Sequence, residues 1–179
     1  MMKTENGKRK TENGKRETGN GKRETGKGRG KSGDFSRYRG RVIIRQFRVD
    51  DTEQVLALWE ACQLTRPWND PRRDIARKLA VQPELFIVGA HNGLIVSTAM
   101  AGYDGHRGVV YYFGVAPGSR GLGYGRRMMS EVERRLLEIG CPKLNLLVRA
   151  ENEAAVGFYR ALGYEADASV SLGKRLIDD

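Results

Sequence analysis

The stretch "GVAPGSRGLGYGRRMM", residues 114–129, is the most informative part of this chain. It follows the apolar run "VVYYF" and holds five glycines, three arginines and one proline in sixteen residues. A strand that passes through a glycine turn into a helix offers unpaired backbone N–H groups and the positive end of a helix dipole to an anion. Glycine lets the backbone approach closely, and Arg120, Arg126 and Arg127 add charge. The stretch therefore predicts a pyrophosphate-binding turn.

Two common nucleotide motifs do not fit this turn. A P-loop requires Gly-Lys-Ser/Thr, which is absent. A dinucleotide fingerprint requires a third glycine, and its loop follows the first strand of the fold. The pattern present is Arg120-x-x-Gly123-x-Gly125, deep in the chain.

The net charge of +10 over 179 residues is unevenly distributed. Residues 1–41 hold 14 Lys/Arg against 5 Asp/Glu, whereas residues 42–179 hold 18 against 17. The basic segment repeats every seven residues from Thr4, without an apolar position that could form a coiled-coil seam. We expect residues 1–40 to be a disordered, low-complexity tail, and residues 41–179 to form one domain.

The chain shows no sign of export or of a membrane span. The tail has no apolar core of a secretory signal, and no run of about 18 apolar residues occurs. Cys62 and Cys141 lack the spacing of a zinc site or a redox pair. We expect two free thiols in a reducing cytoplasm and no metal.

Periodicity and turn residues predict the remaining elements. Strands are expected over 42–47, on both sides of Asn92-Gly93, and over 108–115, which reads as buried on both faces. Helices are expected over 50–64, with Asp51 and Gln54 as a capping box, and over 74–80. A further helix carries the stripe Met129, Val132, Leu136 and Ile139. The last predicted elements are a strand over 143–148, a helix over 151–162 and a strand over 167–177. This order predicts an α/β (α+β) single domain, a central mixed sheet flanked by helices on both faces.

Two motifs on these elements resemble the GNAT superfamily of N-acetyltransferases. The first is Arg/Gln-x-x-Gly-x-Gly/Ala between a central strand and a helix. The second is an asparagine before a helix that carries a tyrosine and closes on Gly-aromatic, here Asn152, Ala155, Phe158-Tyr159 and Gly163-Tyr164. The resemblance covers residues 42–179. Within the superfamily, "AGYDGHRG" and "SLGKRLI" are similar to small bacterial YpeA-type acetyltransferases.

The resemblance implies acetyl-CoA as co-substrate and a set of residues that bind it. Tyr159 would be the general acid that protonates the departing thiolate, although a core tyrosine is the plain alternative. The implied acetyl-CoA residues are Phe113, Gly114, Val115, Arg120, Gly121, Leu122, Gly123, Tyr124, Gly125, Arg126, Asn152 and Tyr159.

The acceptor side is less defined. Many superfamily members that acetylate protein amines carry a glutamate where this chain has Leu147. Candidate bases are Asp70, Asp104 and His106, or a water relay. Trp68 and Asn69 are further candidates for the acceptor pocket, along with these three.

The resemblance implies transfer of an acetyl group to a primary amine of a protein or a small molecule, by a monomer or a homodimer. Two alternatives stay open. One is a non-catalytic acyl-CoA sensor, which an intact Tyr159 disfavours. The other is a nucleic-acid-binding protein that acts through residues 1–40, which the nearly neutral body disfavours.

Overall fold

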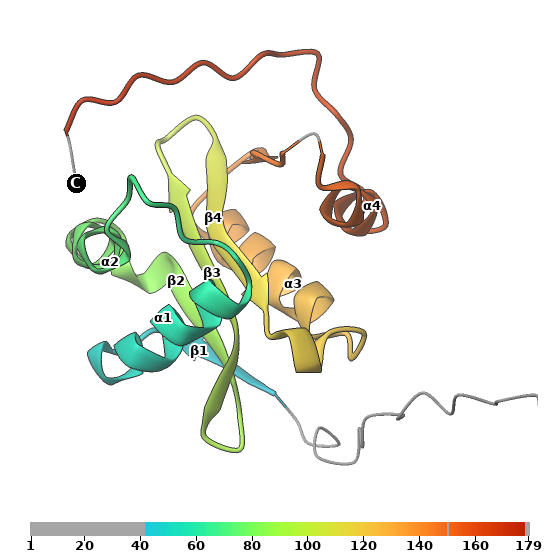
Figure 1. The fold of residues 1–179 in the computed structure, drawn as a ribbon. Helices are drawn as coiled ribbons and strands as arrows, with labels where there is room; N and C mark the ends of the chain where they lie inside the picture. Colours follow the sequence, from blue (N-terminus) through green and yellow to red (C-terminus); the bar gives the residue numbers. More distant parts are fainter. Residues whose placement is uncertain (1–41, 150, 178–179) are drawn as a thin grey trace, which may run out of the picture. The chain divides into compact units, whose positions relative to one another are not determined.

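A computed structural model describes residues 42–149 and 151–177, and the predicted tail lies outside them. Five strands form one sheet in the order β1-β2-β3-β4-β5 (Figure 1). Pairings from β1 to β4 are antiparallel, and β4 pairs with β5 in parallel, so the mixed sheet is confirmed. The strands are β1 (Ile43–Gln46), β2 (Phe86–His91), β3 (Leu94–Tyr103), β4 (Gly108–Val115) and β5 (Leu144–Leu146).

Helices cover both faces of this sheet, as expected (Figure 1). Alternate residues of β2 face opposite sides, because strand side chains alternate. Phe86 joins a core cluster with Trp59 and Ile75 on one face, and Ile87 joins a cluster with Met128 on the other. The helices are α1 (Thr52–Ala61), α2 (Pro71–Ala80), α3 (Tyr124–Glu138) and α4 (Glu153–Arg160).

The hairpin predicted at Asn92-Gly93 is confirmed. Asn92 and Gly93 take positive φ of 50° and 80°, the hairpin geometry that Asn-Gly favours. The Asn152 side chain accepts the Ala155 N–H at 3.1 Å and caps α4. None of the helices in the described stretches is long and apolar enough to cross a membrane.

A β-bulge interrupts the pairing of β3 with β4. Thr98 lies opposite Gly114, but Met100 lies opposite Tyr111, so β4 carries one extra residue. As a result, the consecutive side chains of Tyr111 and Tyr112 both line a cavity on the α2 side of the sheet. Bulges of this kind re-aim side chains beside functional sites.

Two hydrogen bonds, one buried and one partly buried, hold the bulge in place. Trp59 Nε1 donates to Thr98 Oγ1 at 3.0 Å, and the same hydroxyl donates to the Tyr112 carbonyl at 2.8 Å. Thr98 and Trp59 are both fully buried. The Tyr112 ring stacks on Trp59 with a centroid separation of 3.9 Å, which fixes its side chain as well.

We expect Thr98→Val to destabilise the protein. Valine has nearly the same shape, but it leaves the buried Trp59 N–H without its acceptor, at about 1–3 kcal/mol. It also removes the hydrogen bond to the partly buried Tyr112 carbonyl, at about 0.5–1.5 kcal/mol. The expected fall in the free energy of unfolding, measured by denaturant titration, is about 2–4 kcal/mol. Thr52→Val removes only an exposed bond to the Val49 carbonyl and serves as control. Equal stability of the two variants would contradict the assignment.

The strand expected over 167–177 is not formed. This stretch contains no strand, and Val170 and Leu172 are 85% and 91% exposed. Figure 1 shows the stretch running from α4 across to the side of α2, away from the sheet. Alternating apolar residues become a strand only when a sheet edge pairs with them, and here the stretch is tied by Arg175, which donates to Asn69 Oδ1 at 3.0 Å.

Other expectations also need correction. The β4 strand is not buried on both faces, because it borders a cleft and leaves Tyr111 48% exposed. The α3 helix ends at Glu138, which leaves Ile139 45% exposed and outside the buried stripe. The buried stripe includes Met128, which the sequence analysis does not name. Asp51 forms no capping box with Gln54, because its carboxylate binds the Arg45 guanidinium at 2.6 and 2.8 Å.

Candidate active site

A cleft of about 1350 Å³ lies against β4. Its walls come from β4, the segment after α1, the turn before α3, and α4. All the predicted acetyl-CoA residues line it except Leu122, which packs beside Tyr124 in a small core cluster. The fold thus brings together residues that the sequence spreads from Phe113 to Tyr159.

The glycine turn forms one end of the cleft. Gly121 and Gly123 have φ of +75° and +79°, a region that L side chains rarely adopt. No atom lies within 4 Å of the place where either would carry a Cβ. Gly123 is the N-cap of α3, and no side chain caps this helix end. The N–H groups of the first helical turn can therefore donate to an anion that binds at this end.

Gly125 has a different role from the other two glycines. A Cβ at this position would meet the Phe158 ring at 3.1 Å. The absence of a side chain therefore lets α4 pack closely on the start of α3. Arg126 Nη2 adds a contact to the Ala161 carbonyl at 3.4 Å, just beyond the end of α4.

The edge of β4 that faces the cleft is open. The β5 strand pairs only with Gly108, Val109 and Val110, so β4 continues from Tyr111 to Val115 without a partner strand on this side, within the described residues. An open edge of this kind can accept an extended ligand through backbone hydrogen bonds.

Aromatic side chains from β4 and α4 form the inner wall. Phe113 lies 5.7 Å from Phe158 and 5.9 Å from Tyr159, measured between ring centroids. Burial raises the pKa of the Tyr159 hydroxyl to about 12. The hydroxyl therefore stays protonated at neutral pH and can act as a hydrogen-bond donor. Tyr164, which donates to Glu133 Oε1 at 2.6 Å, ties the end of α4 to α3.

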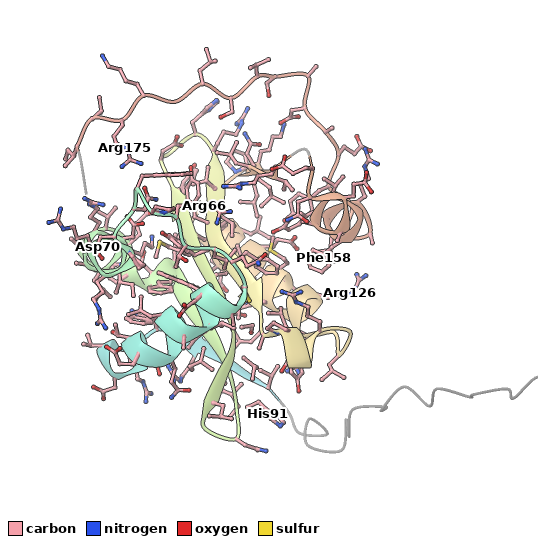
Figure 2. The ribbon with its side chains drawn as sticks, in the orientation of Figure 1. Arg66, Asp70, His91, Arg126, Phe158 and Arg175 are labelled. Carbon is pink, nitrogen blue, oxygen red and sulfur yellow. The ribbon has the colours of Figure 1, made fainter. Side chains whose placement is uncertain are left out.

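Charged side chains make the cleft electropositive. Arg120 Nε donates to the Val115 carbonyl at 3.2 Å, which holds its guanidinium near β4. Figure 2 labels Arg66 and Arg126, which come from separate elements. The lining arginines are Arg66, Arg120, Arg126 and Arg149, and the lining glutamates are Glu60 and Glu151.

The sequence analysis missed Cys62 as a cleft residue. The α1 helix ends at Ala61, and the Cys62 thiol contacts the Val115 carbonyl at 3.3 Å. Burial raises the pKa of this thiol, while the nearby Arg120 opposes the shift, so the cysteine is not an activated thiolate. The apolar spacing of α1 includes Cys62, so the sequence does not show that the helix ends at Ala61 and leaves Cys62 at the cleft.

The predicted acceptor-side residues are not brought together. Asp70 caps α2 and accepts the Arg72 N–H at 2.8 Å, so its carboxylate serves to cap this helix. Asp104 accepts the N–H groups of His106 and Arg107 in the β3–β4 hairpin, at 2.7 Å each. These residues and the 55% exposed Trp68 do not line the cleft. Asn69 instead lines a neighbouring cavity.

Comparison with known proteins identifies the family. Residues 52–164 match the family described as Acetyltransferase (GNAT) family. This chain belongs to the GNAT family. An acetyltransferase of Yersinia pestis (strain Pestoides F) is 54% identical over 136 residues, which are 76% of this chain and 96% of the relative. The chain is therefore a GNAT-family N-acetyltransferase, and the family predicted from its sequence motifs is confirmed.

Solved structures of other proteins share the fold. Ard1 from Thermoplasma volcanium has a TM-score of 0.62 at 22% identity, over 71% of this chain and 84% of that chain. AAC(6')-Iy, solved with the bisubstrate analogue CoA-S-monomethyl-acetylneamine, has a TM-score of 0.63 at 19% identity, over 77% of this chain and 100% of that chain. Within residues 42–149 and 151–177, no group of three or more His, Cys, Asp or Glu could hold a metal ion.

Proposed function

We propose that this GNAT enzyme uses acetyl-CoA and transfers the acetyl group directly to a primary amine while both substrates are bound. The observation that carries the proposal is the uncapped start of α3, where Gly121 and Gly123 open into a cleft rich in arginine. The fold similarity to AAC(6')-Iy, solved with an analogue that contains CoA, supports the same donor.

The cleft fits an extended donor with an anionic end. The pyrophosphate would bind the N–H groups between Gly121 and Arg126, where the helix dipole favours negative charge. The pantetheine arm would lie along the open edge of β4. The acetyl carbonyl would then meet a backbone N–H between Phe113 and Val115, which stabilises negative charge on its oxygen during attack.

Tyr159 would assist the leaving group. Its pKa of about 12 exceeds the value of about 8.5 for a thiol such as free cysteine, so complete proton transfer to a thiolate is unfavourable by about 5 kcal/mol. We therefore propose that the hydroxyl donates a hydrogen bond to the developing thiolate sulfur. The final proton then comes from water.

The attacking amine must also lose a proton. Asp70, Asp104 and His106 lie outside the lining of the cleft, and Leu147, which lines it, cannot accept a proton. We therefore propose that the proton leaves through a water relay.

An assay for thiol release tests the function. Acetyl-CoA is mixed with the full-length protein and a panel of primary amines that includes peptides with free N-termini, lysine peptides and small amines. We expect transfer to at least one class, confirmed by mass spectrometry of the acetylated product. Tight acetyl-CoA binding without transfer to any class would overturn catalysis but not the donor site.

We expect Arg120→Ala to weaken acetyl-CoA binding about 10- to 100-fold, because a charge-assisted hydrogen bond contributes about 1.5–3 kcal/mol. Calorimetry measures the change. Arg127→Ala serves as control, since Arg127 Nη2 donates to the Val42 carbonyl and the side chain does not line the cleft. If Arg120→Ala changes only the Michaelis constant of the acceptor, the arginine belongs to the acceptor pocket instead.

We propose that the catalytic domain comprises residues 41–179 and acts in the cytoplasm, as a monomer or a homodimer. Two free thiols, Cys62 and Cys141, suit a reducing compartment.

A further inference from the structure

A second cavity, of about 600 Å³, adjoins the cleft on the α2 side of the sheet. Its walls come from α2, β3 and β4. Leu64, Tyr111 and Tyr112 line both the cleft and this cavity. Because Tyr112 directly precedes Phe113, a molecule in the second cavity borders the stretch of β4 assigned above to the acetyl group. The volume lies within the range of small-molecule sites, about 300–1,000 Å³.

Lys78 is the unusual residue of this cavity. It lies in the last turn of α2, lines the cavity, and is only 9% exposed. No ion pair or hydrogen bond joins it to another residue of the described ranges 42–149 and 151–177. Burial lowers the pKa of its ammonium, and Glu84 opposes the shift only at longer range. The carbon stem of Lys78 is buried, while its Nζ keeps contact with solvent. An anion that enters the cavity can therefore pair with this ammonium.

The one carboxylate among the described cavity residues does not neutralise Lys78. Asp74 Oδ1 accepts from Arg77 Nη1 at 3.0 Å, and Asp74 Oδ2 accepts from the Tyr112 hydroxyl at 2.6 Å. Both carboxylate oxygens of Asp74 are therefore engaged by groups other than Lys78.

We propose that this cavity holds the acceptor, and that Lys78 binds a carboxylate of it. The acceptor class is thus a small amine that also carries a carboxylate, such as an amino acid or a short peptide, with the amine toward β4. The part of this inference that concerns the amine rests on the proposed function, acetyl transfer to a primary amine. The anion site itself can be tested without catalysis.

Binding of reaction products provides the direct test. N-acetylglycine, N-acetyl-L-leucine and N-acetyl-L-glutamate are titrated by calorimetry into the full-length protein saturated with CoA, each beside the amide that replaces its α-carboxylate. We expect at least one acid to bind about 10- to 100-fold more tightly than its amide, as a charge-assisted hydrogen bond provides. Lys78→Met should remove this difference. Arg72→Met, an exposed cation of the same helix paired with Glu53, should preserve it.

Kinetics separates the two proposals. Acetyl transfer is compared for matched amines with and without a carboxylate, for example 4-aminobutyrate and butylamine. Lys78→Met should raise the Michaelis constant for the carboxylated amine about 10- to 100-fold and leave kcat and acetyl-CoA affinity unchanged. Acid binding through Lys78 without transfer would leave the anion site standing and overturn the function. Failure of all three acids to bind, or equal binding of acids and amides, overturns the anion site.

Discussion

Gly123→Val is expected to weaken acetyl-CoA binding at least about 100-fold, which corresponds to about 2.7 kcal/mol. Gly123 has φ of +79° at the uncapped start of α3. A Cβ at this position would point into open space, and the residue lines the cleft. A β-branched side chain strains this conformation and places methyl groups where we propose that the pyrophosphate binds. Calorimetry, together with a circular dichroism melt, measures affinity and folding on the same sample.

Gly140→Val is a closely matched control. Gly140 also has φ of +79° and no atom within 4 Å of a built Cβ, but it follows the opposite end of α3 and does not line the cleft. The two variants should lose similar stability from strain, and only Gly123→Val should lose acetyl-CoA. Normal affinity in a folded Gly123→Val protein would remove the pyrophosphate assignment.

Tyr159→Phe is expected to lower kcat about 100-fold, within the range of about 1.5–3 kcal/mol that a hydrogen bond to a charged group contributes. The ring and its contacts with Phe113 and Phe158 remain, so acetyl-CoA affinity and the melting temperature should change little. The loss should appear equally in kcat and kcat/KM, because the hydroxyl acts on charge that develops in the transition state.

The pH profile adds a second test of Tyr159. A group whose pKa is about 12 keeps its proton through pH 10, so ionisation of Tyr159 should cause no loss of rate below about pH 11. Tyr103→Phe removes a hydroxyl that donates to the Gly105 carbonyl in the β3–β4 hairpin and to the Gly140 carbonyl after α3, and it should leave kcat unchanged. Turnover of Tyr159→Phe within about threefold of wild type, less than a hydrogen bond to a charged group contributes, would show that Tyr159 is a packing residue.

The donor half of the site could be predicted because its signals are local. A strand, a glycine turn and a helix follow one another between Gly108 and Glu138, and the chemistry of the turn depends on neighbours in sequence. The Asn152 cap is likewise decided within four residues. The start of α2 at Pro71 was missed, although Asp70 followed by proline is a recognisable helix start.

The acceptor half depends on contacts that the sequence does not display. The bulge at Tyr112 rests on Trp59 and Thr98, which lie 39 residues apart, and no strand propensity distinguishes Tyr112 from Tyr111. Lys78 reads as a surface residue of a basic helix, yet packing of α2 against β3 and β4 buries it. The final strand was predicted from alternation alone, which cannot say whether an edge will pair with it.

The bulge in β4 has a consequence for engineering this enzyme. Side chains along a strand alternate between the two faces of the sheet. The extra residue shifts this alternation by one position between Tyr111 and Phe113. Deleting one residue here would exchange the faces of Gly108 through Tyr111, moving Val110 out of the core and its neighbours into it. Libraries that aim to change acceptor choice should therefore vary side chains and keep the length of this strand constant.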